Sequence, residues 1–477
     1  MSERVGQSDT GSRGPRRPVA WVGALMVAGM LIWASAGSAV APPGPALAPA
    51  AVHFLIQWGG AGSQPGTFRG PDGVAIDDRG DVYVADTGNN RVEKFDPLGH
   101  FLGALGRHGG DGTPGKSDGE FTAPRGVAVD GQGDLYVADT GNNRIEKFDP
   151  SGRFLARWGR AGGDGSAGKG SGEFDDPRGL ATDLGGDLYV ADHGNNRVQK
   201  LSPAGAFLAR WGRNGGDGSA GHGPGEFHEP RGVALDRAGN VYVADKLNNR
   251  VQKLTPQGAV VAIWGRNGGN GSAGNAPGEF RIPYSVAIDG SGDVLVADTG
   301  NNRLQELAPS GAVVGRWGRN GGDGSAGAGP GEFNGPYGTA LDCRGGVYVA
   351  DERNQRVQRL GAGLTPTPAC PPQLTVGRLS HRADRRGVGL SVGCDHPCSA
   401  LIHVHLRSGR HRLHGFTTSL ALPASTTGTQ VTLGSRRGPR LLRLARRRGP
   451  LAIRVLVTAD GFAGRAQPVA RRARVHA

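Results

Sequence analysis

The sequence predicts an all-β protein whose main part is a six-bladed β-propeller, and two observations carry this prediction. The first is a six-residue motif, clearest at Asp139–Arg144, whose leading aspartates return 53 residues apart. These aspartates are Asp86, Asp139, Asp192, Asp245, Asp298 and Asp351. The second is that each repeat contains four short apolar runs bounded by Gly, Pro, Asn and Asp, which is the pattern of strands and turns. Four antiparallel strands in a repeat of about 50 residues are typical of a propeller blade.

The second repeat shows the four expected strands most clearly. They are residues 126–130, 134–139, 144–148 and 154–158. In an up-and-down blade, the loop between the second and third strands lies on the same face as the long connection to the next blade. We call this the loop face, and we call the opposite side, which has only tight turns, the turn face. Because loops carry function more often than tight turns do, we expect a site on the loop face.

The sixth repeat lacks a fourth strand, and an isolated apolar run at residues 53–58 matches the missing one. Trp58 ends this run, as Trp158, Trp211, Trp264 and Trp317 end the fourth strands of four repeats, while Leu105 takes that place in the first repeat. We therefore expect residues 53–58 to complete the sixth blade. Closure of this kind removes the exposed sheet edges of an open array.

The repeated residues resemble the NHL repeat. The similar segments read Gly-Val-Ala-x-Asp, then Gly-Asp-x-Tyr-Val-Ala-Asp, then Asn-Asn-Arg-Val, over about residues 52–360. The resemblance implies a six-bladed propeller, which agrees with the strand pattern. Propellers of this family bind proteins, RNA or small ligands, and related ones have lyase or hydrolase activity. The fold alone therefore does not choose a function.

The two ends of the chain differ from the repeats. Residues 1–41 combine four arginines with an apolar run at 18–34 and an Ala-Val-Ala sequence at 39–41, which predicts a cleaved signal peptide or an uncleaved N-terminal membrane anchor. Residues 42–51 are a Pro/Ala-rich spacer. Residues 361–372 form a linker, and alternating runs in 373–477 predict a small basic β-sandwich-like domain. We expect the protein to be secreted or at the cell surface.

The net charge of +13 is unevenly distributed. Residues 361–477 carry 19 arginines and three acidic residues, whereas residues 51–360 carry 32 basic and 37 acidic residues. The predicted propeller therefore lacks the basic surface that a nucleic-acid-binding domain needs. We do not predict a nucleic-acid partner.

The four cysteines are Cys343, Cys370, Cys394 and Cys398. In an exported protein, an even count suggests disulfides, and four cysteines allow three pairings. We favour the local pair Cys394–Cys398, which would leave Cys343 to pair with Cys370. A zinc site is not favoured, because His396 has no second ligand pair at a suitable spacing. No metal and no cofactor are predicted.

The identical parts of the repeat are expected to be structural, so function is sought where the repeats differ. One variable position precedes the glycine of each first strand, near the central channel. Its residues are Asp72, Arg125, Arg178, Arg231, Tyr284 and Tyr337, which we call the mouth residues. Three arginines on one side with two tyrosines opposite could hold an anionic or glycan ligand. The variable pair of the repeated motif adds His193, Lys246, Leu247, Glu352 and Arg353 on the loop face.

These patterns favour an exported, non-catalytic binding or scaffold protein of the cell envelope, with a protein or glycan ligand on the loop face. An active site needs several different groups in an asymmetric arrangement, and blades three to five are nearly copies of one another in their loops. The alternatives are a hydrolase or lyase with a site in the channel, and an RNA-binding protein. Membrane contact is expected only through the N-terminal segment, and no oligomeric state is predicted.

Overall fold

The computed structural model describes residues 53–183, 185–342 and 345–361, and beyond them the backbone of eight further strands. The predicted signal peptide or anchor and the spacer lie outside the described residues. So do Cys343, Cys370 and the side chains of Cys394 and Cys398, and the predicted disulfides therefore stay predictions. In the part of the chain that is described, no helix is both long and apolar enough to cross a membrane.

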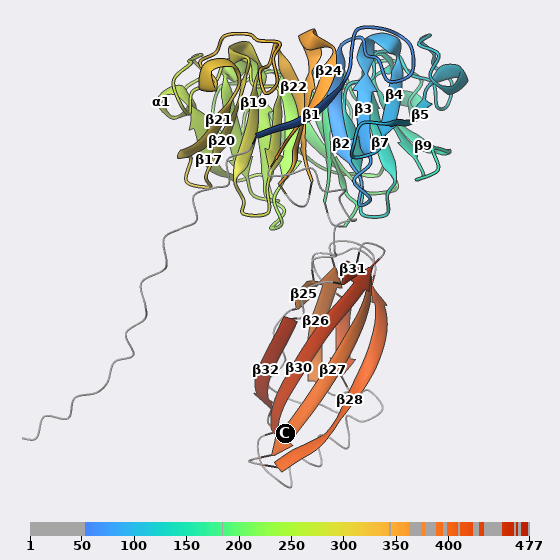
Figure 1. Ribbon diagram of the computed structural model, residues 1–477, viewed down its shortest axis with the longest axis vertical. Helices are drawn as coiled ribbons and strands as arrows, with labels where there is room; N and C mark the ends of the chain where they lie inside the picture. The colour runs from blue at the N-terminus through green and yellow to red at the C-terminus, as the bar shows by residue number, and fades with distance from the viewer. Residues whose placement is uncertain are drawn as a thin grey trace, which may run out of the picture. The chain divides into compact units, whose positions relative to one another are not determined.

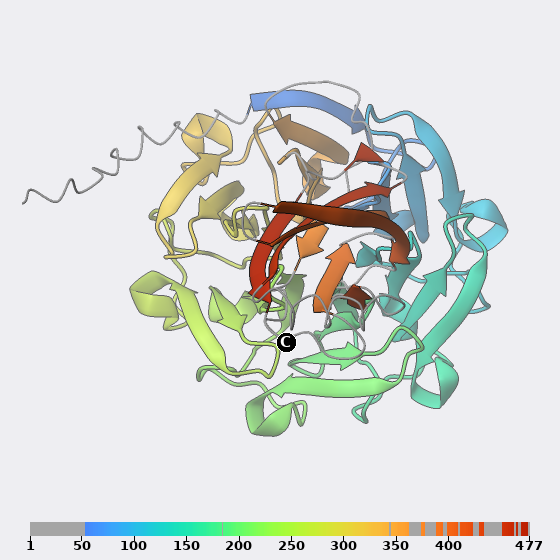
Figure 2. The ribbon, with the colours of Figure 1, turned by 90° about the horizontal axis from the view of Figure 1, so that it is seen from below.

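Six four-stranded antiparallel sheets surround a central axis, one for each repeat (Figures 1 and 2). The first, innermost strands are β2 (Pro71–Ile76), β6 (Val127–Val129), β10 (Pro177–Thr182), β14 (Pro230–Leu235), β18 (Ser285–Ile288) and β22 (Pro336–Leu341). The second strands are β3 (Val82–Asp86), β7 (Leu135–Asp139), β11 (Leu188–Asp192), β15 (Val241–Asp245), β19 (Val294–Asp298) and β23 (Val347–Asp351).

The outer two strands of each blade follow in the same order. The third strands are β4 (Arg91–Phe95), β8 (Arg144–Phe148), β12 (Arg197–Leu201), β16 (Arg250–Leu254), β20 (Arg303–Leu307) and β24 (Arg356–Gly361). The fourth, outermost strands are β5 (Phe101–Leu105), β9 (Phe154–Gly159), β13 (Phe207–Gly212), β17 (Val260–Gly265), β21 (Val313–Trp317) and β1 (His53–Gly59). The described helices are single turns, such as α1 (Arg266–Gly269) and the 3-10 turn η3 (Thr140–Asn142).

The ring is closed by a strand from the other end of the propeller, as the sequence predicts. Strand β1 pairs antiparallel with β24, in a register that runs from His53 opposite Gly361 to Gly59 opposite Arg356. It thereby supplies the fourth strand of blade six. The Trp58 ring then packs on Tyr348 of the same blade and on Phe95 of blade one, so β1 joins the first and last blades.

The hydrophobic core is divided into six clusters, and each lies between two neighbouring blades. The second strand of each blade is buried along its whole length, because both of its faces pack against adjacent sheets. A phenylalanine from each inter-blade connection is fully buried in these clusters. The six are Phe68, Phe121, Phe174, Phe227, Phe280 and Phe333.

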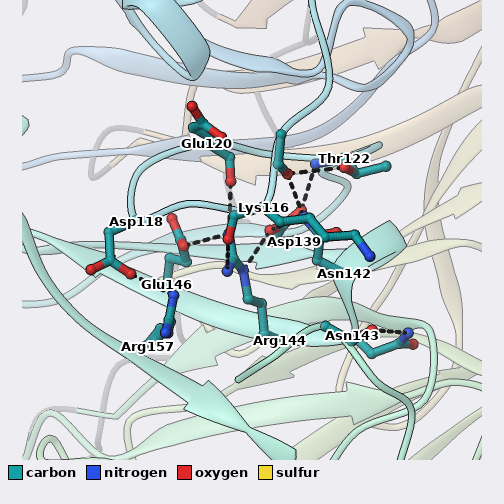
Figure 3. A network of polar contacts seen from close by, with 12 residues as sticks. Lys116, Asp118, Glu120, Thr122, Asp139, Asn142, Asn143, Arg144, Glu146 and Arg157 are labelled. Atoms are coloured by element: carbon teal, nitrogen blue, oxygen red, sulfur yellow. Dashed lines mark hydrogen bonds and ion pairs between the residues drawn. The ribbon is translucent and has the colours of Figure 1, made fainter. Parts of the chain in front are cut away.

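The repeated Asp and Arg form a buried ion pair in every blade, as Figure 3 shows for blade two. Arg144 donates from Nε to Asp139 Oδ2 at 2.8 Å, and its Nη atoms donate to the carbonyls of Lys116, Ser117 and Glu120 in the preceding connection. Asp139 also accepts from Thr122 N and Asn142 Nδ2. Asp139 does not cap the turn that follows it, since its carboxylate makes no cap hydrogen bond there. Its role is to fasten the long connection to the blade.

The second Asn of the motif links each blade to the next. Asn143 adopts a left-handed conformation with φ 49°, which asparagine tolerates better than most residues. Its Oδ1 accepts from Asp176 N at 2.9 Å, and its Nδ2 donates to Gly165 O at 3.2 Å. In blade six the longer Gln355 replaces this asparagine and accepts from Gly70 N of blade one at 2.7 Å. The motif therefore continues across the closure of the ring.

The C-terminal strands form two antiparallel sheets. The first sheet contains β25 (Leu374–Val376), β26 (Val388–Cys394) and β29 (Thr429–Leu433). The second contains β28 (His411–Leu422), β27 (Cys398–Ser408), β30 (Leu451–Gly461), β31 (Gly464–Arg465) and β32 (Val469–Val475).

Candidate functional site

The mouth residues meet at one end of the channel, as their shared repeat position predicts. They line a cavity of about 80 Å³ together with the glycines and valines that follow them. In four blades the register between the first and second strands shifts at this point, for example between Pro71 and Val74 and between Pro230 and Val233. A β-bulge of this kind redirects a side chain from the sheet. Asp72 and Arg231 lie within such bulges.

A glycine after five of the six mouth residues allows the innermost strands to approach closely around the axis. Gly73 N donates to Arg125 O of the next blade at 2.9 Å. A Cβ built on Gly126 would lie 1.7 Å from Arg178 O, so no larger residue fits there without a backbone shift. Ser285 replaces the glycine in blade five, and its hydroxyl lies 2.9 Å from Thr339 Oγ1. These contacts make the channel narrow at the level of the mouth.

One arginine crosses this narrow channel. Arg231 of blade four donates from Nη2 to Asp72 Oδ2 of blade one at 2.5 Å, and these two blades are opposite in the ring of six. Asp72 also accepts from Arg125 Nη1 at 2.9 Å. The Arg231 guanidinium lies 3.8 Å from the ring centre of Tyr284 and 4.8 Å from that of Tyr337. The ion pair and the two aromatic contacts hold Arg231 buried at 4% exposure, as a bridge across the channel.

A second chain of contacts runs outward from the mouth over blades three and four. Arg178 donates to Asp176 Oδ2 at 2.7 Å, and His193 Nδ1 lies 3.0 Å from the same oxygen. His193 Nε2 lies 3.3 Å from Glu229 Oε2, although the contact lacks hydrogen-bond geometry. Glu229 in turn accepts from Lys246 Nζ at 2.5 Å. The variable residues His193 and Lys246 therefore belong to one network with the mouth residue Arg178.

The pKa shifts in this network follow from burial and from the ion pairs. Burial raises the pKa of Asp176, but bonds from His193 and Arg178 outweigh it, and the pKa lies below its ordinary value. Burial lowers the pKa of His193, against the effect of Asp176, so its imidazole is neutral at pH 7. Burial also opposes ionisation of Glu229, but Lys246 dominates and lowers its pKa. The carboxylates of the network are therefore ionised.

The remaining variable residues lie at the edge of this arrangement. Burial raises the pKa of Glu352, which also interacts electrostatically with Asp72, Arg231 and Arg125. The side chain of Arg353 is 64% exposed, with its Nε 3.8 Å from Glu352 Oε2. Leu247 is 37% exposed. Leu247 and Arg353 are therefore accessible to a partner, whereas Arg231 and His193 are not.

The structure changes the expected chemistry of the mouth. Three arginines were expected to offer free positive charge, but each of them is paired with a carboxylate. Arg125, Arg178, Arg231 and Lys246 pair with Asp72, Asp176 and Glu229, and Arg353 lies beside a fourth acid, Glu352. The acids and bases around the mouth are therefore paired with one another. The site residues predicted from the sequence include neither Asp176 nor Glu229, although both stand at a repeat position that varies from blade to blade.

Two further clusters of possible ligands lie away from the mouth. His222 and His228 face each other at 5.5 Å between ring centres, and His222 Nδ1 lies 2.6 Å from Asn248 Oδ1. On the turn face, carboxylate oxygens of Asp289, Asp293 and Glu306 lie within 4.8 Å of one another. In other blades a lysine or arginine occupies the place of Glu306 and pairs with the equivalent aspartates, as Lys147 does with Asp134.

Comparison with known proteins agrees with this architecture. The NHL repeat model matches residues 68–95, 121–148, 174–201, 227–254, 280–307 and 333–360. The chain is 32% identical over 205 residues to mouse NHL repeat-containing protein 3, which is 40% of this chain and 54% of that protein. It is 37% identical over 135 residues to rat peptidylglycine alpha-amidating monooxygenase, 28% of this chain and 14% of that protein. These matches leave much of both relatives uncovered.

Among solved structures, a streptogramin B lyase is similar in fold, with 16% identity and a TM-score of 0.43 over 65% of this chain and 97% of the lyase. At this identity the similarity concerns the fold alone. The six matched segments coincide with the six blades, each running from the buried phenylalanine to the end of the third strand. The chain therefore belongs to the NHL-repeat proteins, with its six repeats folded as one β-propeller.

Proposed function

We propose that the protein is an exported, non-catalytic binding protein of the cell envelope that recognises a polypeptide partner on its loop face. The observation that carries this proposal is the convergence of the non-repeated charged residues into one internally paired network at the channel mouth. Export rests on the N-terminal sequence features. Binding rests on the surface that the network and its accessible neighbours create.

The pairing of the charges favours a polypeptide over a free anion. A small anion would have to compete with Asp72 and Asp176 for arginines that already donate hydrogen bonds to these carboxylates. A protein surface instead combines exposed apolar, aromatic and arginine contacts with a polar rim. Beside the mouth, Leu247 supplies an exposed apolar side chain and Arg353 an exposed arginine.

The same pairing argues against a channel enzyme. A general base must reach the proton it removes, yet His193 is buried between Asp176 and Glu229 and does not line the cavity. Asp72 already holds two arginines. A channel hydrolase or lyase would instead show turnover that is lost in a His193→Ala variant with an unchanged melting temperature, and that result would replace the binding proposal.

The test compares two double variants in the producing cells. Leu247→Asp with Arg353→Glu alters the loop face, while Arg153→Glu with Leu208→Asp alters exposed positions on the turn face and the outer edge as a matched control. After cross-linking in cells, proteins bound to the tagged chain are quantified by mass spectrometry. We expect a defined partner to be lost at least tenfold from the loop-face variant and kept by the control. Equal recovery from both would refute the loop-face assignment.

Export is tested separately. Cell fractionation and mass spectrometry of the N-terminus should find the protein outside the cytoplasm, either beginning after residue 41 or retaining its first residues in the membrane fraction. A full-length protein in the cytoplasm would contradict export and leave the loop-face test unaffected.

A further inference from the structure

A second cavity lies at the outer edge of the propeller, between blades one and two, and we call it the rim pocket. Its volume is about 180 Å³, and its lining is mainly apolar. Its lining includes Tyr83, Leu102, Leu105, Leu135, Pro150 and Gly152, together with the charged residues Lys94 and Asp149. Strand β5, which carries Leu102 and Leu105, is the outermost strand of its blade (Figure 1). The rim pocket is thus separate from the channel mouth.

The corresponding place in other blades is filled by an indole ring. Trp158, Trp211 and Trp264 stack on the tyrosines of their own blades, with ring centres 6.0, 5.9 and 6.0 Å apart. Each indole also reaches the turn of the next blade. Cβ atoms built on Gly205, Gly258 and Gly311 would lie 1.8, 1.9 and 2.5 Å from these rings. The arrangement of tyrosine, indole and turn glycine is therefore a regular feature of the inter-blade contact.

Blade one keeps the tyrosine and the turn glycine but has no indole. Leu105 occupies the tryptophan position, and a Cβ on Gly152 would lie 2.9 Å from its Cδ2. Strand β5 also has Gly103, whose Cβ position is open space with nothing within 4 Å. Because leucine is smaller than tryptophan and Gly103 has no side chain, a space remains beside Tyr83, and this space is the rim pocket.

We propose that the rim pocket binds an indole ring, supplied as a tryptophan side chain by a partner polypeptide. Blades two, three and four indicate which group fits, because each holds an indole between the equivalent tyrosine and the equivalent turn glycine. Apolar cavities of about 150 Å³ bind small aromatic molecules. Tyr83 offers a stacking surface, and ring pairs of this kind contribute beyond their buried area.

The surroundings of the pocket favour a side chain over a free aromatic molecule. Leu102, which lines the pocket, is 52% exposed, and it can contact residues that flank the inserted ring. The outer edge of β5 also has no neighbouring strand in its sheet, so its backbone groups are available to an extended segment. A free indole would use neither feature.

The experiment titrates the purified protein with N-acetyl-tryptophanamide and, separately, with indole, followed by ligand-detected NMR. We expect saturable binding of both, with the amide binding at least as tightly. Leu105→Trp should fill the rim pocket from within, weaken binding at least tenfold and raise the melting temperature. Trp158→Leu should open an equivalent pocket between blades two and three and double the stoichiometry.

Each outcome decides the proposal. Absence of saturable binding to the wild-type protein, or binding that Leu105→Trp leaves unchanged, would overturn it. If indole binds and the amide is excluded, the pocket takes a free molecule and the polypeptide assignment is wrong. Should Leu105→Trp fail to fold, Gly103→Leu narrows the same space from a position without positive φ. The Leu247→Asp, Arg353→Glu variant should bind both probes normally, which separates this pocket from the loop-face proposal.

Discussion

Glu146 is predicted to destabilise the propeller at neutral and alkaline pH, and Glu146→Gln to remove that effect. In blades three to six this position is glutamine. Gln199, for example, donates from Nε2 to Glu173 O and Asp192 Oδ2 and accepts from Gly172 N. Glu146 accepts the equivalent bond from Gly119 N. Its other carboxylate oxygen is buried 2.8 Å from Arg144 Nη2, in a contact without hydrogen-bond geometry. A protonated glutamate could donate where glutamine donates, whereas a carboxylate cannot.

The size of this destabilisation follows from the linkage between ionisation of Glu146 and unfolding. Burial raises the pKa of Glu146 from 4.5 to about 8, against the attraction of Arg144. A raised pKa in the folded state means that the full stability is present below pH 4.5 and is lost as pH rises toward 8. Each pKa unit corresponds to about 1.4 kcal/mol, so the loss is on the order of 3 kcal/mol at pH 7 and 5 kcal/mol above pH 8. Glu93 in blade one behaves in the same way, with its pKa raised by burial to about 7.

The assay is urea denaturation at pH 5, 7 and 9, followed by tryptophan fluorescence, because five tryptophans lie in the outermost strands. Glu146→Gln should match the wild type near pH 5 and gain on the order of 3 kcal/mol at pH 7. The reciprocal Gln199→Glu should lose stability with the same dependence on pH. Other buried carboxylates are shared by both proteins and largely cancel in the difference. A Glu146→Gln variant that is equally stable at all three pH values, or less stable at pH 9, would refute the reasoning.

Three further predictions concern the same repeated contacts. Arg303→Ala should lower the free energy of unfolding by about 3–5 kcal/mol, because Asp298 stays buried without its base; Arg153→Ala, which breaks an exposed pair, should cost under about 1 kcal/mol in the same urea series. Glu306→Lys should raise the free energy of unfolding by about 0.5–1 kcal/mol, because it restores the base that faces the turn aspartates in other blades. This increase should become smaller in 1 M salt. An unchanged or lower melting temperature at low salt would contradict this prediction. Trp58→Ala should lower the free energy of unfolding by about 3 kcal/mol, because it removes the contacts of β1 with Tyr348 and Phe95. Leu55→Ala in the same strand is the control and should have a smaller effect. Equal losses from both variants would contradict a specific role of the indole contact.

The regular period explains how much of the fold could be predicted. Once Asp139 and Arg144 are placed in one blade, the same positions are placed in all six, and a missing strand in the last repeat requires a donor such as residues 53–58. The regular period also explains why the mouth residues come together, since equivalent positions of the repeats lie at the same level along the central axis of a closed ring. The identity of each partner could not be predicted in this way. Whether Arg125 turns to Asp72 or to solvent depends on the neighbouring side chains.

The bridge from Arg231 to Asp72 shows why this difference matters for function. By repeat position alone, the arginines lie on one side of the channel and the tyrosines on the other, which suggests an open basic mouth. The long side chain of Arg231 instead crosses the channel, which is narrow because glycines line it. Its guanidinium reaches Asp72, the one acidic residue among the six mouth residues. Any ligand that enters the channel must displace this buried pair and the stacking on Tyr284, whereas a partner on the loop face pays no such cost. The same arginine that first suggests a ligand inside the channel is thus the strongest reason to look for one on the surface around it.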